Sequence, residues 1–230
     1  MRTLLYVPII HTSADLGSLA EEVDRKGLEN FGENMWRDHL RTIDGFWDAL
    51  SLYFASIHVT GAKIFQDGMI ADGDLGLNII QEGDKAGSKN HRLVSKLLHR
   101  GALLMKTEDF NLVKKERDRL LKMIRAKTTA EKLFGLIIYK LTKKTLLRQR
   151  DEYIAQRIDQ ALKEGETGIL FIGAYHHVQP RLARDIKIKE IKEIRKIKEY
   201  QSLLPYYPKN KKRFEDLSGY LISKVDEGDI

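Results

Sequence analysis

Two short, continuous apolar runs constrain the fold of this chain more than any other feature. Residues Leu4–Ile10 and Gly168–Ile172 are almost wholly apolar, and such runs are typical of strands buried on both faces of a parallel sheet. A polar turn that contains histidine follows each run, with His11 after the first and His176 after the second. Stretches with helical spacing of apolar residues lie between them. The pattern predicts an α/β fold, a parallel or mixed sheet flanked by helices.

Shorter apolar stretches indicate three further strands. Ala62–Gln66 and Ala102–Met105 are expected to be short strands. The alternation of isoleucine and lysine over 186–191 predicts a strand with one exposed face, as at the edge of a sheet. Candidate helices separate most of the candidate strands, which is the order expected of an α/β domain.

Apolar residues at helical spacing account for most of the remaining chain. From Leu16 to about Phe54 we expect mostly helix, broken near 27–32 and at Gly45, where glycines interrupt the pattern. The glycines within 83–87 predict a loop. Further helices are predicted over Asn90–His99 with Ser88 as its cap, over Phe110–Lys163 and over Phe214–Val225.

No boundary between domains is evident in the sequence. No linker rich in proline, glycine and serine divides the chain, and no segment repeats with a period of roughly 20–50 residues. A chain of 230 residues is long enough to bury a sizeable core. We therefore expect a single α/β domain over residues 1–230, with 108–150 as a long helical insertion.

The composition excludes several classes of site. The chain has no cysteine, which excludes disulfides, thiolate metal centres and cysteine nucleophiles. No apolar run approaches about 18 residues, so no transmembrane segment is predicted. The N-terminal apolar run lacks a small-residue cleavage site and is expected to be a strand rather than a signal peptide. A cytoplasmic location agrees with these features.

The charge is segregated along the chain. The net charge is +7. Residues 106–150 hold 14 basic and 5 acidic side chains, which gives +9, and residues 181–213 hold 12 and 4, which gives +8. Such segments can contact an acidic partner such as nucleic acid. A solvated, lysine-rich surface explains them as well and is the interpretation that we favour, because no aromatic side chains of the kind that stack on bases are interleaved with them.

Histidines at strand ends are the first candidates for chemistry. His176 and His177 follow Gly173 directly after the second apolar run, and His11 follows the first. Ligands of open α/β sheets collect at the carboxyl ends of strands, so His11 and His176 would meet if both strands are parallel. Two imidazoles and a carboxylate would form an open metal site. Hydrogen bonding at a strand end is the simpler explanation. The candidate carboxylates are Asp15, Glu21, Glu22 and Asp67.

A second candidate is the pair Arg150-Asp151 on a predicted helix. Asp151 shares the apolar face of that helix with Ile154 and Ile158. A carboxylate on an apolar face is costly unless it is paired or used. Asp151 could pair with an arginine, cap the helix, or orient a histidine.

Together these two segments resemble the C-terminal signature of the TraB/Tiki superfamily, the group that includes ChaN-like and erythromycin-esterase-like proteins. In that group an Arg-Asp-x-x-Met-Ala-x-x-Ile helix precedes an apolar strand that ends in Gly-x-x-His. This chain has Arg150-Asp151, with Ile154 in place of the methionine, and then Gly173-Ala174-Tyr175-His176. The resemblance covers roughly 30 residues well. Near the N-terminus the family has a second Gly-x-x-His, of which this chain keeps only His11.

The resemblance implies an α/β fold and a metal-dependent hydrolase, with peptidases among the implied activities. On that hypothesis His11 and His176 bind a divalent metal ion (Zn, Mn or Fe), and Asp67 or Glu21 is the third ligand. The catalytic candidates are His176, His177 as a proton shuttle, Arg150 for an anionic substrate group and Asp151 to orient a ligand.

The expected partner of a hydrolase is a small-molecule or peptide substrate, and self-association into a homo-oligomer is left open. The alternative is a non-catalytic regulatory or binding protein that uses its basic segments to contact an acidic partner. Nucleic acid is such a partner, although we do not favour it. Strongly salt-dependent association would distinguish this alternative from the hydrolase.

Overall fold

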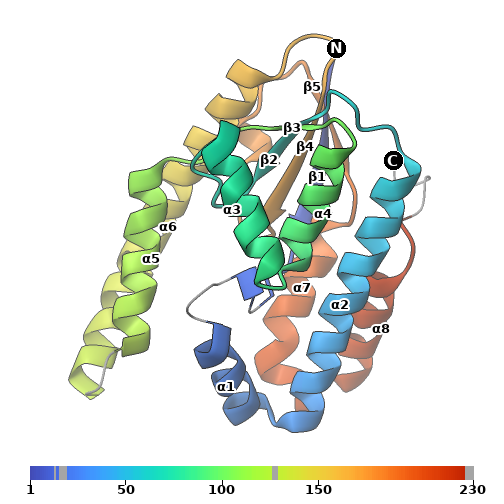
Figure 1. Cartoon of the computed structure of the whole chain (residues 1–230). Coiled ribbons are helices and arrows are strands. Elements are labelled where there is room, and N and C mark those ends of the chain that lie inside the picture. Colours follow the sequence, from blue (N-terminus) through green and yellow to red (C-terminus); the bar gives the residue numbers. More distant parts are fainter. Residues whose placement is uncertain (13, 16–19, 126–128, 226–230) are drawn as a thin grey trace.

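A five-stranded parallel sheet forms the centre of the computed structural model, which describes residues 1–12, 14–15, 20–125 and 129–225 (Figure 1). The order of its strands is β3-β2-β4-β1-β5, and every pair is parallel. The predicted α/β fold is therefore confirmed, with a parallel rather than a mixed sheet. The strands are β1 (Arg2–Ile9), β2 (Lys63–Gln66), β3 (Leu103–Leu104), β4 (Thr167–Gly173) and β5 (Ile186–Glu190).

The helices cover both faces of the sheet, as Figure 1 shows. One face packs against α2, α3, α4, α7 and α8 in a core that includes Trp47, Phe54 and Phe171. The other face packs against the end of α6 in a second core that includes Ile154 and Ile158. The helices are α1 (Ala20–Phe31), α2 (Glu33–Ser56), α3 (Gly73–Lys85), α4 (Lys89–His99), α5 (Phe110–Arg125), α6 (Thr129–Ala161), α7 (Ile194–Leu203) and α8 (Lys211–Ile222), with short 3-10 helices η2 (Gln179–Arg181) and η3 (Leu204–Lys209).

Helices α5 and α6 lie between β3 and β4 along the chain, and α6 continues to Ala161, beyond the expected insertion over 108–150. They lie side by side and project beyond the sheet at the lower left of Figure 1. The last three turns of α6 return to the sheet, where Ile154 and Ile158 are buried against Leu4 and Leu170. The same end of α6 carries Asp151, so the apolar face that anchors the helix also fixes the position of this carboxylate.

Two expectations about glycine were wrong. Helix α2 continues through Gly45 without a break, because this glycine lets α8 approach closely. A Cβ atom at Gly45 would lie 2.7 Å from Cγ2 of Ile222. Gly83 lies inside α3, a helix that the expected loop over 83–87 left out. The chain turns only at Gly87, whose φ of 90° favours glycine. The predicted helix start at Leu16 lies outside the described residues.

Other elements agree with the sequence. Ser88 caps α4, where its Oγ accepts a hydrogen bond of 3.1 Å from the backbone N–H of His91. Strand β5 lies at an edge of the sheet. None of the helices in the described ranges is long and apolar enough to cross a membrane.

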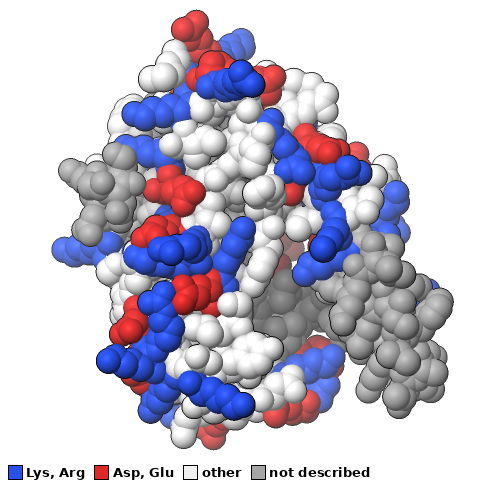
Figure 2. Space-filling model, turned by 180° about the vertical axis from the view of Figure 1, so that it is seen from behind, with Lys and Arg blue, Asp and Glu red and all other residues white. Residues whose placement is uncertain are grey.

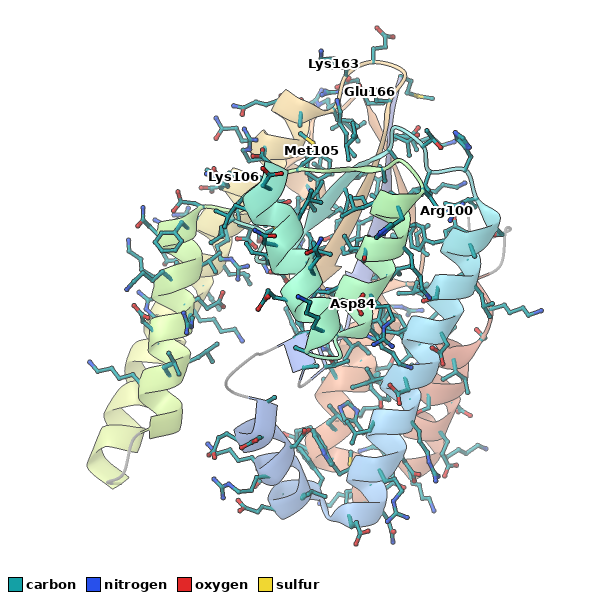
Figure 3. The ribbon with its side chains drawn as sticks, in the orientation of Figure 1. Asp84, Arg100, Met105, Lys106, Lys163 and Glu166 are labelled. Carbon is teal, nitrogen blue, oxygen red and sulfur yellow. The ribbon has the colours of Figure 1, made fainter. Side chains whose placement is uncertain are left out.

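The turn before β4 closes the amino-terminal edge of the sheet, at the top of Figure 3, where Lys163 and Glu166 are labelled. The backbone N–H of Lys163 donates to Oε2 of Glu166 over 2.6 Å. Nζ of Lys63, at the start of β2, donates to the carbonyl of Ala161 over 2.6 Å. These bonds fix where β4 begins and leave the opposite, carboxyl edge for the histidines.

We expect the free energy of unfolding to depend on pH through His39, which lies between α2 and α7. Burial lowers the pKa of this ring to about 4, and its Nδ1 lies 2.9 Å from the hydroxyl of Tyr200. Below a pH of about 6.5, His39 becomes protonated in the unfolded chain but stays neutral in the folded chain. Stability should therefore fall by about 3 kcal/mol between roughly pH 6.5 and pH 4.

Urea unfolding at several pH values checks this expectation. His39→Gln should remove most of the slope, whereas His99→Gln, at an exposed position at the end of α4, should keep it. An equal slope in His39→Gln and in the unchanged chain would contradict it.

Candidate functional site

The carboxyl ends of three neighbouring strands place the candidate residues together. His11 follows β1, Asp67 follows β2, and His176 lies in the turn after β4. In the strand order β3-β2-β4-β1-β5, the chain leaves β1 toward one side of the sheet and leaves β4 toward the other. Such a reversal opens a crevice at the carboxyl ends of the strands. His11 and His176 therefore emerge at one edge, as predicted.

A buried pair of Asp151 and His176 is the centre of the site. Oδ1 of Asp151 lies 2.6 Å from Nδ1 of His176, and the two residues are only 2% and 6% exposed. Oδ2 of Asp151 accepts the backbone N–H of His177 over 3.0 Å. The carboxylate thus holds both the ring and the turn that carries it. Of the roles that the sequence left open for Asp151, the structure selects the orientation of a histidine.

Asp67 connects the two histidines. Its Oδ2 lies 3.4 Å from Nε2 of His11 and 3.5 Å from Nε2 of His176. The same oxygen accepts the backbone N–H of Gly173 over 3.0 Å. A Cβ atom at Gly173 would lie 3.1 Å from Asp67 Oδ2 and 3.5 Å from His11 Nε2. Glycine at this position therefore leaves the room in which the three side chains meet.

Arg150 fixes the other side of Asp67. Its Nη2 donates to Oδ1 of Asp67 over 2.6 Å, and its Nε donates to Oε2 of Glu108 over 2.7 Å. Further hydrogen bonds join the guanidinium to Oε1 of Glu108 and to Glu116. Four of the five N–H groups of Arg150 are engaged in this way. The arginine binds carboxylates of the chain itself, so we assign it a positioning role rather than the binding of a substrate group.

The site holds more carboxylates than fixed positive charges. Burial of the His176 ring favours its neutral form, but the charge of Asp67 and the hydrogen bond to Asp151 outweigh burial and raise its pKa. His11, whose side chain is 39% exposed, has a raised pKa for a similar reason, because Asp67 and Asp15 outweigh desolvation. Desolvation would raise the pKa of Asp67, but His176, Arg150 and His11 hold it well below its usual range. The site therefore favours additional positive charge.

A hydrogen-bonded chain extends from the site to the start of α4. Oδ2 of Asp15 accepts the backbone N–H of Thr12 over 2.6 Å and lies 4.0 Å from Nδ1 of His11. Oδ1 of Asp15 accepts the hydroxyl of Ser88, whose Oγ lies 2.8 Å from Nδ1 of His91. Ser88 is fully buried, so its hydroxyl positions Asp15 and is not available to a substrate.

The chemistry of the donor atoms suits the divalent ion that the sequence predicted, because imidazole and carboxylate bind Zn, Mn and Fe. Their present arrangement is different. Among the residues that the structure describes, no three His, Asp or Glu side chains are placed to hold a metal ion. Asp67 instead accepts hydrogen bonds from Arg150 and Gly173 and lies 3.4 and 3.5 Å from the two imidazoles. Glu21, proposed as a third ligand, lies exposed on α1. The divalent ion therefore stays a prediction.

A pocket of about 450 Å³ opens beside the Asp151–His176 pair. His176 and His177 form part of its wall, together with Tyr6 from β1 and residues of η2, β5 and α7. His177 is exposed. The buried histidine thus borders a space of the size that small molecules occupy in proteins.

Sequence reasoning missed Glu108, Glu116 and Tyr6. Glu108 follows the candidate strand Ala102–Met105 closely, so the rule that found His11 and His176 would have found it too. Glu116 lies in the middle of α5, and Tyr6 lies within an apolar strand. Neither position carries a signal that distinguishes it from a surface carboxylate or a core aromatic residue.

We expect Arg150→Met to lower the free energy of unfolding by about 3–5 kcal/mol, because Asp67, Glu108 and Glu116 would lose their shared countercharge. Arg150→Lys should lower the free energy of unfolding by less, because an ammonium group restores the positive charge. It does not restore the planar set of N–H donors of the guanidinium. Urea unfolding measures both. Arg148→Met is the matched control, because its ion pair with Glu152 is long and exposed. Equal losses at positions 150 and 148 would show that the buried cluster does not carry this stability.

Comparison with known proteins adds no assignment to this geometry. Searches against protein-family models, curated proteins and solved structures found no match for the chain. The similarity to the TraB/Tiki superfamily therefore rests on Arg150-Asp151 and Gly173-Ala174-Tyr175-His176 with the segments around them, and its functional implications are proposals.

Proposed function

We propose that this chain is a hydrolase in which His176 carries the reacting proton. The observation that supports the proposal is the buried pair of Asp151 and His176, 2.6 Å apart, at the wall of a pocket at the carboxyl edge of the sheet. A histidine held by a buried carboxylate is the arrangement that general acid–base catalysis requires. Core packing alone does not require such a pair.

The proposed reaction uses both nitrogens of the His176 ring. Asp151 accepts a hydrogen bond from Nδ1–H, which leaves Nε2 as the base when the ring is neutral. Nε2 takes a proton from water while the water oxygen bonds to the carbonyl carbon and the carbonyl π electrons move to oxygen. When the tetrahedral intermediate collapses, the bond to the leaving group breaks, and the leaving group takes the proton from His176. Asp151 stabilises the imidazolium between these steps.

Asp67 and Arg150 support the same chemistry. The Asp67 carboxylate faces Nε2 of His176 and Nε2 of His11 at 3.5 and 3.4 Å, so it favours the protonated rings. Arg150 keeps Asp67 in place through the bond to Oδ1. His177, exposed at the pocket wall, is placed to exchange protons with solvent. The remaining residues thus hold the charge and position of the pair.

The divalent ion is the other form of this proposal, and the family resemblance supports it. His11, His176 and Asp67 would hold it, with Asp67 exchanging its imidazole contacts for the ion. Because Nδ1 of His176 is bonded to Asp151, only Nε2 could bind the ion, so the ion and the metal-free base are alternatives at the same atom. When bound, the ion would lower the pKa of a water and polarise the substrate oxygen. The excess of carboxylates at the site favours such a cation. Peptides and small acyl compounds are the substrate classes that we propose.

The alternative, an acidic partner bound by the basic segments, has less support. Several cations of residues 181–213 pair within the chain, as Arg213 does with Glu199 at 2.6 Å and Lys196 with Glu193 at 2.5 Å. Figure 2 shows Lys and Arg interspersed with Asp and Glu on the face that it presents. Those arrangements are typical of a solvated surface.

A panel of chromogenic esters, peptides and phosphoesters tests the hydrolase. We expect the unchanged chain to hydrolyse at least one, and His176→Ala and Asp151→Asn to lose roughly 10²–10⁴-fold in kcat/KM. His58→Gln, an exposed histidine outside the site, is the matched control and should keep full activity. No turnover of any substrate by the unchanged protein, with and without added metal, would overturn the proposal, as would equal turnover in His176→Ala.

Plasma mass spectrometry tests the ion separately. We expect about one Zn, Mn or Fe per chain after reloading, and its loss in His11→Ala and His176→Ala but not in His58→Gln. Equal metal content in all four proteins would contradict the assigned ligands and would leave the Asp151–His176 pair as a metal-free acid–base group.

A further inference from the structure

The pocket beside His176 is lined both by candidate catalytic residues and by two cations. Tyr6, His176 and His177 line it beside the candidate catalytic pair, and Arg195 and Lys198 of α7 line it as well. A ligand that fills the pocket would therefore touch the reactive histidine and two cations at once. Its volume of about 450 Å³ suits a small molecule or the end of a peptide.

The acidic side chains of this pocket are already bonded within the protein. Glu190 accepts hydrogen bonds from Nε2 of Gln179 over 2.9 Å and from the backbone N–H of Ile194 over 3.2 Å. Glu193 pairs with Lys196, which does not line the pocket, at 2.5 Å. Glu190 is thus held by neutral donors and keeps its charge, whereas Glu193 has a cation as its partner.

The two cations of the pocket are bonded weakly or not at all. Arg195 lies 3.8 Å from Glu193, with its side chain 84% exposed. Lys198 has neither an ion pair nor a hydrogen bond among the residues that the structure describes. The side chains of both residues are therefore available to a negatively charged group of a ligand.

Tyr6 supplies the pocket with a hydrogen-bond donor. It is only 1% exposed, yet its hydroxyl makes no hydrogen bond to any part of the described chain. Burial raises its pKa, and the charges of Asp151, Glu190 and Asp67 raise it further, so the hydroxyl keeps its proton. The hydroxyl oxygen is not among the fully buried polar atoms that lack a partner, so it is accessible from the pocket that Tyr6 lines and can donate a hydrogen bond to a bound molecule.

We propose that this pocket binds the substrate and selects compounds that carry an anionic oxygen group, a carboxylate or a phosphate, beside the bond to be cleaved. The inference rests on the proposed hydrolase and names its substrate class. Arg195 and Lys198 bind the anionic group, while Tyr6 donates to an oxygen at the reacting end, next to His176. The anion then fixes which bond of the substrate faces the histidine.

Calorimetric titration with inorganic phosphate and, separately, with acetate tests the anion site without relying on turnover. We expect saturable binding of at least one probe, weakened roughly tenfold by the double variant Arg195→Gln/Lys198→Gln. Lys211→Gln/Lys212→Gln removes the same charge at the start of α8, away from the pocket, and should bind as the unchanged chain does. Tighter binding of phosphate or of acetate identifies which of the two groups is preferred.

The outcomes separate this inference from the hydrolase. His176→Ala should lose turnover roughly 10²–10⁴-fold and still bind the probe, since Arg195 and Lys198 stay in the pocket. Absence of saturable binding of both anions would overturn the inference and leave the hydrolase intact. Equal weakening in the two double variants would also overturn it, because binding would then follow net charge alone. Binding with no turnover of any substrate would instead count against the hydrolase.

Discussion

The guanidinium of Arg150 is the interaction on which the rest of the site depends. It joins three carboxylates from separate segments, namely Asp67 after β2, Glu108 after β3 and Glu116 on α5. These bonds attach the helical insertion to the carboxyl edge of the sheet. Because Asp151 is the next residue on α6, the same anchor determines where the partner of His176 lies. Loss of Arg150 would therefore disturb both the position of the insertion and the geometry of the site.

An excess of negative charge connects this anchor to function. Arg150 is the one arginine among Asp67, Glu108, Glu116 and Asp151. Burial raises the pKa of Glu108, and the neighbouring carboxylates raise the pKa of His11 and His176, so each of these groups is shifted toward its protonated form. A site that holds protons on histidines can deliver them to a substrate. A divalent ion would satisfy the same requirement. Either form of the proposed function, with the ion or without it, thus agrees with one imbalance of charge.

The sequence predicted the sheet and the edge at which the site lies better than it predicted the individual contacts. The two apolar runs identified β1 and β4, and from their parallel order followed the prediction that His11 and His176 emerge at one edge. The apolar face of α6 marked Asp151 as unusual. Gly45 was mistaken for a helix break because glycine disfavours helices in general, while its close contact with Ile222 depends on tertiary packing. The roles of Glu116 and Tyr6 could not be predicted, because they depend on contacts between segments that are distant in the sequence. A charged residue on a helix and an aromatic residue in a strand are common in any fold.

Proton NMR of the imidazole N–H groups tests the central claim most directly, because it detects the bond between Asp151 and His176 without a substrate. We predict a strongly downfield resonance from Nδ1–H of His176. It should be lost in Asp151→Asn and in His176→Ala, and should persist in His58→Gln. A spectrum without such a resonance at any pH, or one in which it persists in folded Asp151→Asn, would contradict the central role of this pair.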